Sequence, residues 1–234
     1  MTGMLASVNS LIEARLALTM EVDIIDLKQP NQGALGALEI DQINEIVAYV
    51  NKACPVSATI GDLPLDPVTI FNAVENVVNT GVDYVKIGFF PDGDWLATLQ
   101  KLHEKTNDWK EHYQCQLIAV LFADSEPDLA LLTALKNHGF SGVMLDTINK
   151  QQGSLTQLMT ATAIAQFVNA AKKHQLLCGL AGSLKIEDIA RLLPYQPDYL
   201  GFRGALCNDH VRTAQLSETA ISNIKRAMAR EVAA

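Results

Sequence analysis

Eight short apolar segments recur along this chain, and amphipathic segments separate them. The apolar segments are residues 4–8, 23–28, 56–62, 83–89, 116–124, 142–147, 177–183 and 198–206. Between them lie stretches such as 40–52 and 217–232, in which apolar residues recur at the three- and four-residue spacing of a helix face. Strict alternation of strands and helices predicts parallel strands joined by right-handed crossovers. Eight such units in 234 residues favour an α/β fold of the (β/α)8 TIM-barrel type over an open doubly wound sheet.

The two faces of the predicted strands differ in character. In the fourth segment, Val85 and Ile87 share one face and Tyr84, Lys86 and Gly88 share the other, because successive side chains on a strand alternate. The same division recurs in two further segments, residues 56–62 and 198–206. An open sheet covered by helices on both sides would be apolar on both faces. A closed barrel with helices outside and a confined interior fits the pattern better.

The composition is that of an ordinary globular protein, with 49% hydrophobic and 19% charged residues. No linker rich in Pro or Ser divides the chain, so we expect a single catalytic domain over residues 1–234. No apolar run approaches the roughly 18 residues that a membrane span requires. Glu13 and Arg15 also interrupt the N-terminal stretch before a signal-peptide core can form, so we expect a cytoplasmic protein.

The net charge of −8 argues against a nucleic-acid partner. It also means that an anionic substrate needs a locally basic pocket. The four cysteines and five histidines show no zinc, redox or catalytic-triad spacing. We therefore expect no metal and no cofactor, and a small-molecule substrate in place of a nucleic acid or a membrane. We also expect the chain to form a homo-oligomer.

Charged residues collect at the carboxyl ends of the predicted strands, where the active sites of TIM barrels lie. By alternation, five of them can point into the barrel: Asp26, Lys28, Lys86, Asp146 and Arg203. Lys150 follows Asp146 by four residues and joins these candidates.

Each candidate also has a structural interpretation. Asp26 and Lys28 can form a buried ion pair, and Arg203 can brace the barrel through a carboxylate. Lys150 can be a solvated loop residue. Turn formation or helix capping is an alternative for two aspartates that follow strands, Asp62 and Asp124.

The two lysines at predicted strand ends, Lys28 and Lys86, are harder to explain as structural residues. An ammonium group resists burial, so a buried lysine needs a partner or a lowered pKa. Two inward lysines on nearby strands repel each other, which lowers the pKa of at least one amine. A neutral amine can attack a carbonyl carbon to form a Schiff base, and the second lysine, Asp26 or Asp146 can then transfer protons. The pattern favours aldol, isomerase or elimination chemistry through an imine and leaves these three open.

Small residues follow the last two predicted strands. In many TIM barrels the loops at this position bind phosphate through backbone N–H groups. Gly182 and Ser183, and then Gly204, permit close approach of the backbone, while Arg203 or Lys185 can supply positive charge. Alternatively, the glycines only allow tight turns. We expect a phosphorylated carbonyl compound as the substrate.

Six sequence blocks together carry a resemblance to a known family: DIIDLKQPNQGALGA, SATIGD, DYVKIGF, MLDTINK, AGSLKIEDI and RGALC. They resemble the (5-formylfuran-3-yl)methyl phosphate synthase family, which makes the furan precursor of methanofuran. The resemblance implies a lyase-type synthase that condenses two molecules of glyceraldehyde 3-phosphate with loss of one phosphate and water. It also implies that Lys28 forms the Schiff base and that Lys86 transfers protons. Three further active-site residues follow from it: Asp26, Asp146 and Lys150.

Two other functions stay open from the sequence. One is a class I aldolase that acts on a different phosphorylated sugar, and the other is a non-catalytic barrel that binds a phosphometabolite. The presence of Asp26, Lys28 and Lys86 together speaks against the second. Within the expected site, we assign Lys28 as the nucleophile and Asp26 as the neighbour that positions it and handles protons.

Overall fold

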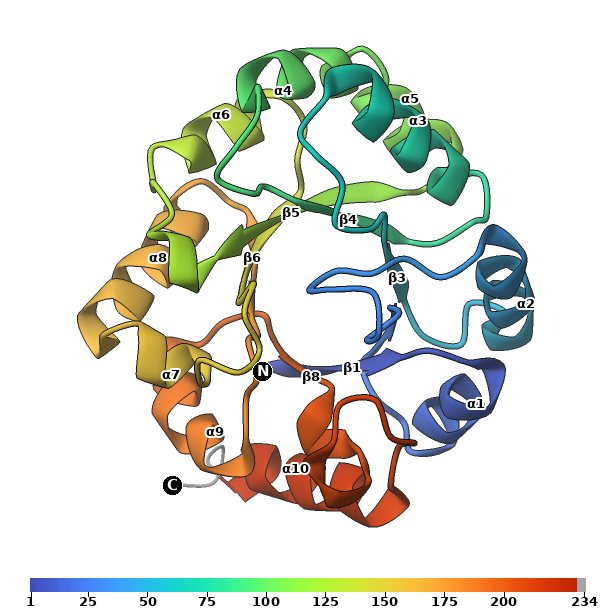
Figure 1. The fold of residues 1–234 in the computed structure, drawn as a ribbon, viewed down its shortest axis with the longest axis vertical. Coiled ribbons are helices and arrows are strands. Elements are labelled where there is room, and N and C mark those ends of the chain that lie inside the picture. Colours follow the sequence, from blue (N-terminus) through green and yellow to red (C-terminus); the bar gives the residue numbers. More distant parts are fainter. Residues whose placement is uncertain (231–234) are drawn as a thin grey trace.

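The computed structural model describes residues 1–230 and confirms the predicted barrel (Figure 1). Each strand pairs in parallel with the next, and β8 pairs with β1 to close the sheet. The strands are β1 (Gly3–Val8), β2 (Ile24–Leu27), β3 (Val56–Thr59), β4 (Tyr84–Gly88), β5 (Gln116–Phe122), β6 (Gly142–Asp146), β7 (Leu177–Leu180) and β8 (Tyr199–Phe202). Every one of them overlaps an apolar segment that the sequence marks as a strand.

Helices surround the strands, as Figure 1 shows. They are α1 (Leu11–Thr19), α2 (Ile40–Val50), α3 (Pro67–Val78), α4 (Trp95–His103), α5 (Thr106–His112), α6 (Leu131–Asn137), α7 (Leu155–Leu158), α8 (Ala161–Lys173), α9 (Ile186–Leu192) and α10 (Glu218–Arg230). Several begin at a side chain that accepts a hydrogen bond from an N–H group of the first turn, namely Ser10, Asp66, Asp94 and Thr160. Within residues 1–230, no helix is both long and apolar enough to cross a lipid bilayer.

Buried apolar side chains form two clusters, one outside the barrel wall and one inside it. Ile25 and Leu27 of β2 belong to the outer cluster, where they join buried helix residues such as Ile43 and Ile46. The inner cluster contains Leu5, Ile118, Val120, Phe122, Met144 and Tyr199. The predicted division between the two faces of the strands therefore holds for β2. On β5 the inward face is apolar as well, so the polar part of the interior lies elsewhere.

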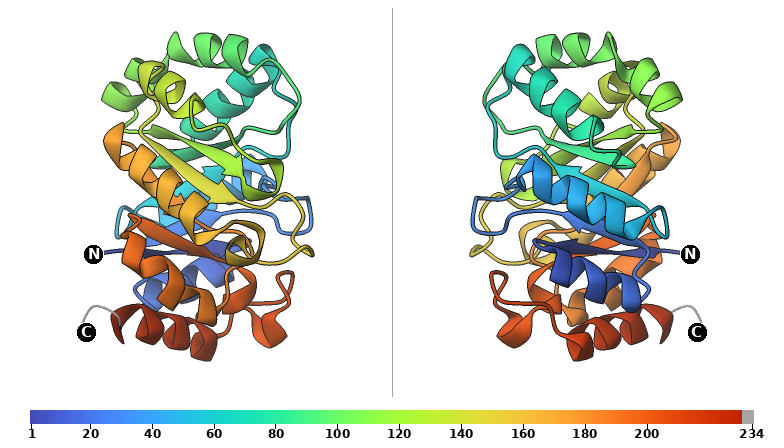
Figure 2. Two further views of the ribbon diagram at one scale, coloured as in Figure 1. Left: turned by 90° about the vertical axis from the view of Figure 1, so that its left-hand side faces the viewer. Right: turned by 90° about the vertical axis from the view of Figure 1, so that its right-hand side faces the viewer.

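The loop between β2 and α2 lies across the open end of the barrel in Figure 1. Its residues Ala34 and Leu35 reach the inner apolar cluster. The carboxylate of Asp62 holds this loop, because it accepts hydrogen bonds from Ala34 N at 2.7 Å and Leu35 N at 2.6 Å. Figure 2 shows that the loops after β2 and β6 project at the end of the barrel opposite the N-terminus. The carboxyl ends of the strands and these loops therefore form one mouth, which the β2–α2 loop partly covers.

Candidate active site

The inward-facing charged residues occupy two successive layers inside the barrel. In a TIM barrel each layer takes one residue from each of four alternate strands. Contacts between the side chains place one layer at Asp26, Lys86, Met144 and Gly201. The next layer toward the mouth contains Lys28 and Asp146, whose side chains contact each other. Residues two apart on one strand point the same way but belong to different layers.

The deeper layer holds a buried ion pair with a full set of partners. Lys86 Nζ lies 2.6 Å from Asp26 Oδ1, and both side chains are almost completely buried. The hydroxyls of Ser7 and Ser57, on the strands either side of β2, donate to the same carboxylate at 2.7 Å. Lys86 Nζ also lies 4.0 Å from Met144 Sδ. These contacts fix the Asp26 carboxylate and hold the Lys86 amine beside it.

The upper layer is built around the carboxylate of Asp146. Lys28 Nζ lies 3.3 Å from Asp146 Oδ2, and the Lys150 amine contacts Asp146 Oδ1. Thr147 N donates to Asp146 Oδ1 at 2.8 Å. Lys150 also donates to the carbonyl and hydroxyl oxygens of Thr147, so it is a site residue and not a solvated one. One carboxylate thus holds two amines at the mouth of the barrel.

The ion pair between Asp26 and Lys28, considered as a structural alternative, does not form. Both side chains point inward, as alternation predicts, but each pairs with a residue from another strand. The reason is geometric, since two residues on the same face of a strand are about 6.6 Å apart along it. Across the barrel, side chains of one layer come closer than that. Asp146, not Asp26, is the carboxylate that contacts Lys28.

Burial and neighbouring charges shift the pKa values of these groups. Burial lowers the pKa of the Lys86 amine; the charge of Asp26 opposes this, and the charge of Lys28 adds to it. Burial likewise lowers the pKa of Lys150 to about 8, against the effect of Asp146. Burial by itself would raise the pKa of Asp146, but the charges of Lys150 and Lys28 outweigh it and hold this pKa well below the usual range. The expectation of at least one inward amine with a lowered pKa is met, and burial is the larger cause.

A pocket of about 1040 Å³ opens above the two layers. It brings together every site residue that the sequence singled out: Asp26, Lys28, Lys86, Asp146, Lys150, Gly182, Ser183, Arg203 and Gly204. The pocket runs on past the loops after β7 and β8 toward the first turns of α9 and α10. It has room for a ligand of the size of a sugar phosphate or larger.

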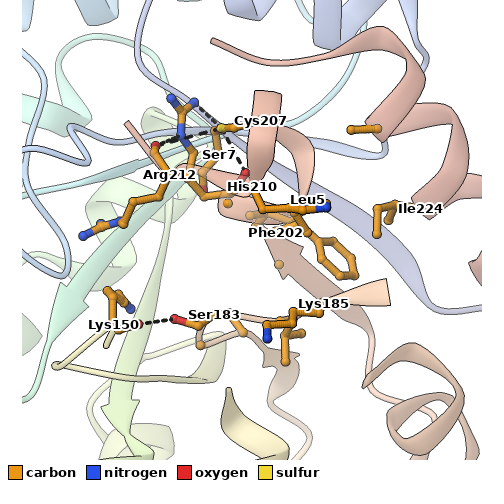
Figure 3. A pocket seen from close by; sticks show the side chains of 18 of the residues that line it. Leu5, Ser7, Lys150, Ser183, Lys185, Phe202, Cys207, His210, Arg212 and Ile224 are labelled. Atoms are coloured by element: carbon orange, nitrogen blue, oxygen red, sulfur yellow. Dashed lines mark hydrogen bonds between the residues drawn. The ribbon is translucent and has the colours of Figure 1, made fainter. Parts of the chain in front are cut away.

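The loop after β7 turns tightly at Gly182 and lines the pocket. Gly182 has φ +100°, and a Cβ atom there would lie 2.8 Å from Thr147 Cγ2, so the position requires glycine. Ser183 Oγ donates to the carbonyl oxygen of Lys150 at 3.3 Å and links this loop to the one after β6 (Figure 3). Within residues 1–230, no acceptor binds the N–H groups of four residues that line the pocket here: Ser183, Leu184, Gly204 and Ala205. These donors are available to a phosphate.

Arg203 does not offer a donor to a phosphate, which corrects the binding role that the sequence assigned to it. Its guanidinium forms a bidentate ion pair with Glu13 of α1. The remaining N–H groups donate to three carbonyl oxygens, those of Ser7, Arg212 and Ala214. All five donors of the guanidinium are therefore engaged. Arg203 fills the other role considered for it, that of a brace bound to a carboxylate.

The two aspartates considered as turn or cap residues both hold loops. Asp62 binds the β2–α2 loop, as described above. Asp124 accepts hydrogen bonds from Ile148 N at 2.9 Å and Asn149 N at 2.8 Å, in the loop after β6. Both are structural, and the loop that Asp124 holds carries Lys150.

Sequence reasoning overlooked three residues of the site. Ser7 and Ser57 are the register partners of Asp26 on β1 and β3, and their inward position in predicted strands was the available signal. Arg212 lies in the segment between β8 and α10 and lines the pocket. No periodicity marks it, because the segment around it is irregular.

Comparison with known proteins assigns the chain to a family. The family model of 4-HFC-P synthase matches residues 4–225. The chain belongs to the 4-HFC-P synthase family. This confirms the resemblance seen in the six sequence blocks, and membership supports an enzyme with a (5-formylfuran-3-yl)methyl phosphate synthase role.

Relatives of this 4-HFC-P synthase family member cover most of its length. A protein of Methylorubrum extorquens, named as a candidate (5-formylfuran-3-yl)methyl phosphate synthase, is 36% identical over 225 residues, covering 96% of this chain and 91% of the relative. The (5-formylfuran-3-yl)methyl phosphate synthase of Methanocaldococcus jannaschii is 33% identical over 202 residues, covering 83% of this chain and 86% of the relative.

Solved structures at low identity share the barrel. The 3-hexulose-6-phosphate synthase of Salmonella typhimurium superposes with a TM-score of 0.67 at 16% identity, covering 98% of this chain and 99% of that one. The phosphoribosyl anthranilate isomerase of Thermus thermophilus gives a TM-score of 0.68 at 11% identity, covering 99% and 100%. These likenesses show the TIM-barrel fold of the family member.

Proposed function

We propose that this protein condenses two molecules of glyceraldehyde 3-phosphate into (5-formylfuran-3-yl)methyl phosphate through a Schiff base on Lys28. One phosphate and water are lost, and the product serves methanofuran biosynthesis in the cytoplasm. The observation that carries the proposal is the pair of buried lysines in one pocket, with Lys86 beside Asp26 at the floor and Lys28 beside Asp146 nearer the mouth. Buried amines of this kind are suited to imine chemistry with a carbonyl substrate.

Lys28 is the better placed of the two amines to act as nucleophile. It lies in the layer nearer the mouth, and its contact with the carboxylate of Asp146 is long at 3.3 Å. Lys86 lies deeper and is held 2.6 Å from Asp26. In our proposal the neutral Lys28 amine attacks the carbonyl carbon of the first triose phosphate, and loss of water gives the imine.

The Asp26–Lys86 pair is suited to the proton transfers that follow. Burial lowers the pKa of Lys86, which favours the neutral amine that can accept a proton from the carbon next to the imine. The resulting enamine adds to the aldehyde carbon of the second triose phosphate. The hydroxyls of Ser7 and Ser57 keep the Asp26 carboxylate in place while Lys86 changes charge.

The phosphate of the first triose has a binding site in this scheme. The free N–H groups of Ser183, Leu184, Gly204 and Ala205 surround the space between the loops after β7 and β8. A phosphate held there leaves the carbonyl end of the triose directed toward the floor of the pocket. Ring closure, dehydration and loss of one phosphate then give the aromatic furan, and hydrolysis of the imine by water releases the furan aldehyde and restores the free Lys28 amine.

Reductive trapping tests the Schiff base on Lys28. Incubation with glyceraldehyde 3-phosphate and borohydride, followed by peptide mass spectrometry, should give an adduct on Lys28 in the wild-type protein. Lys28→Arg should form no adduct and no furan aldehyde, since the guanidinium keeps the charge but is not a usable nucleophile. Lys173→Arg, at an exposed position of α8, is the matched control and should behave as wild type.

The trapping result separates the proposal from its alternatives. An adduct on Lys86 in place of Lys28 would reverse the roles of the two amines. Absence of any adduct in the wild-type protein would reject the imine mechanism. An adduct on Lys28 without a product that absorbs as a conjugated furan aldehyde would indicate an aldolase with a different product.

A further inference from the structure

Arg212 is a cationic side chain of the pocket wall with unused hydrogen-bonding capacity. Its Nη2 donates to the carbonyl oxygen of Gly33 in the β2–α2 loop at 3.1 Å. Within residues 1–230 no oxygen accepts a hydrogen bond from its other four N–H groups, whereas those of Arg203 are all engaged. The Arg212 side chain is half-buried and lines the pocket. A cation placed in this way is suited to an anionic ligand.

The surroundings of Arg212 place it at the mouth of the site. Its charge acts on Lys150, whose pKa it helps to lower, and Asp146 and Asp62 act on Arg212 in turn. Figure 3 shows Arg212 and Lys150 on facing sides of the pocket. The pocket lining carries four carboxylates and a larger number of cationic groups: Asp26, Asp146, Glu187 and Asp209 against Lys28, Lys86, Lys150, Lys185, Arg203 and Arg212. The mouth therefore carries local positive charge on a chain whose net charge is −8.

The substrates of the proposed reaction carry two phosphates, and the loops after β7 and β8 account for one. The second phosphate needs a different group of donors. Lys150 supplies charge, but its N–H groups already contact Asp146 and both oxygens of Thr147. Arg212 has the planar fork that binds phosphate through two parallel hydrogen bonds.

We propose that Arg212, assisted by the charge of Lys150, binds the phosphate of the second glyceraldehyde 3-phosphate. This inference rests on the proposed function for the identity of the ligand. The hydrogen bond from Arg212 to the carbonyl oxygen of Gly33 orients the guanidinium before substrate binds, which reduces the conformational entropy lost on binding. The first triose enters the imine at Lys28, and Arg212 holds the second triose above it.

Kinetics of Arg212→Gln test this assignment. The substitution keeps the backbone carbonyl of Arg212, which accepts from Arg203, so the fold should be retained. In Arg212→Gln, formation of the borohydride-trapped adduct on Lys28 should require the same concentration of glyceraldehyde 3-phosphate as in wild type. The KM for furan formation should rise about tenfold to hundredfold, as expected for loss of a hydrogen-bonded charge pair. Arg212→Lys, with the charge but not the fork, should fall between the two.

Arg191→Gln on α9 removes an exposed arginine and serves as the matched control, with unchanged trapping and KM. Equal KM values for Arg212→Gln and wild type would overturn the assignment. So would a parallel loss of trapping and furan formation, because Arg212 would then act on the first triose or on the fold.

Binding of inorganic phosphate gives a readout that does not depend on the reaction. Titration calorimetry should show two phosphates per wild-type chain and one per Arg212→Gln chain. An unchanged number would overturn the inference even if furan synthesis is observed. Loss of one phosphate site in the variant, with no furan made by wild type, would reject the proposed function and leave the anion site at Arg212 standing.

Discussion

The two carboxylates of the site, Asp26 and Asp146, accept hydrogen bonds from different sets of donors. Asp26 accepts from one amine and two hydroxyls at the floor, while Asp146 accepts from two amines and a backbone N–H at the mouth. Both are buried, and removing either would leave a buried amine without its acceptor. A lysine in that position can shed its proton and stay buried as a neutral amine. Substitutions of the two carboxylates should therefore impair different steps of the reaction.

Substitution of Asp26 by Asn should impair proton transfer and spare imine formation. Without the Asp26 carboxylate, nothing stabilises the charged form of Lys86 that arises when the amine accepts a proton. The value of kcat should therefore fall by roughly 10²- to 10⁴-fold. Adduct formation on Lys28 should continue, because Lys28 contacts Asp146 and not Asp26. Borohydride trapping and furan absorbance measure the two steps separately.

The exposed Asp41 of α2 offers a matched control, and Asp41→Asn should leave both steps unchanged. If Asp26→Asn abolished trapping as completely as furan formation, Asp26 would position Lys28 after all. In that case the separation into two layers would have no functional meaning.

Alternation along strands was enough to predict which residues point inward, but not which of them pair. Asp26 and Lys28 share a face of β2, and that much can be read from the chain. Their partners depend on the tilt and stagger of eight strands, which bring Lys86 to the level of Asp26 and Asp146 to the level of Lys28. The stagger is a property of the closed barrel, so no local sequence pattern predicts it.

At the scale of elements, the loops at the mouth are held by carboxylates that play no part in the chemistry. Asp62 binds the β2–α2 loop and Asp124 binds the loop after β6. The β2–α2 loop covers the side of the mouth near the apolar face of β5, so the pocket opens toward β6, β7 and β8. From sequence, a turn or cap was one of the roles considered for Asp62. Nothing in GDLP indicates that its partners lie 27 and 28 residues earlier.

Asp62→Asn should loosen this loop specifically. The amide has one carbonyl oxygen to offer, so Ala34 N or Leu35 N loses its acceptor, at a cost of about 1–2 kcal/mol in the free energy of unfolding. Hydrogen exchange should accelerate at the amides of residues 33–36 and stay unchanged in α2. Since Gly33 also accepts from Arg212, phosphate binding should weaken in parallel.

Asp41→Asn on α2 is again the control, with exchange at residues 33–36 as in wild type. Unchanged exchange in Asp62→Asn would show that Ala34 and Leu35 are held by apolar packing alone.

At the scale of the whole molecule, one buried ion pair joins the beginning of the chain to its last quarter. β8 pairs with β1, and just beyond this seam Arg203 binds Glu13 of α1. Glu13 also accepts from Asn9 N at 2.9 Å and Leu216 N at 3.2 Å, so it connects segments before α1 and α10. A buried glutamate in the first helix carries no signal in the sequence, because its partner is 190 residues away. For that reason the brace could not be told from a phosphate ligand before the structure.

Arg203→Gln should therefore act on stability and not on phosphate binding. Removing one partner of a buried ion pair typically costs about 3–5 kcal/mol, since the other charge stays buried without a partner. Urea unfolding should show that decrease, and Arg191→Gln on the surface should change the free energy of unfolding by less than about 0.5 kcal/mol. At temperatures where Arg203→Gln is folded, its KM for glyceraldehyde 3-phosphate should match wild type, because the phosphate contacts are assigned to Arg212 and to backbone N–H groups. Unchanged stability together with a raised KM would reverse the assignment of the two arginines and make Arg203 the phosphate ligand.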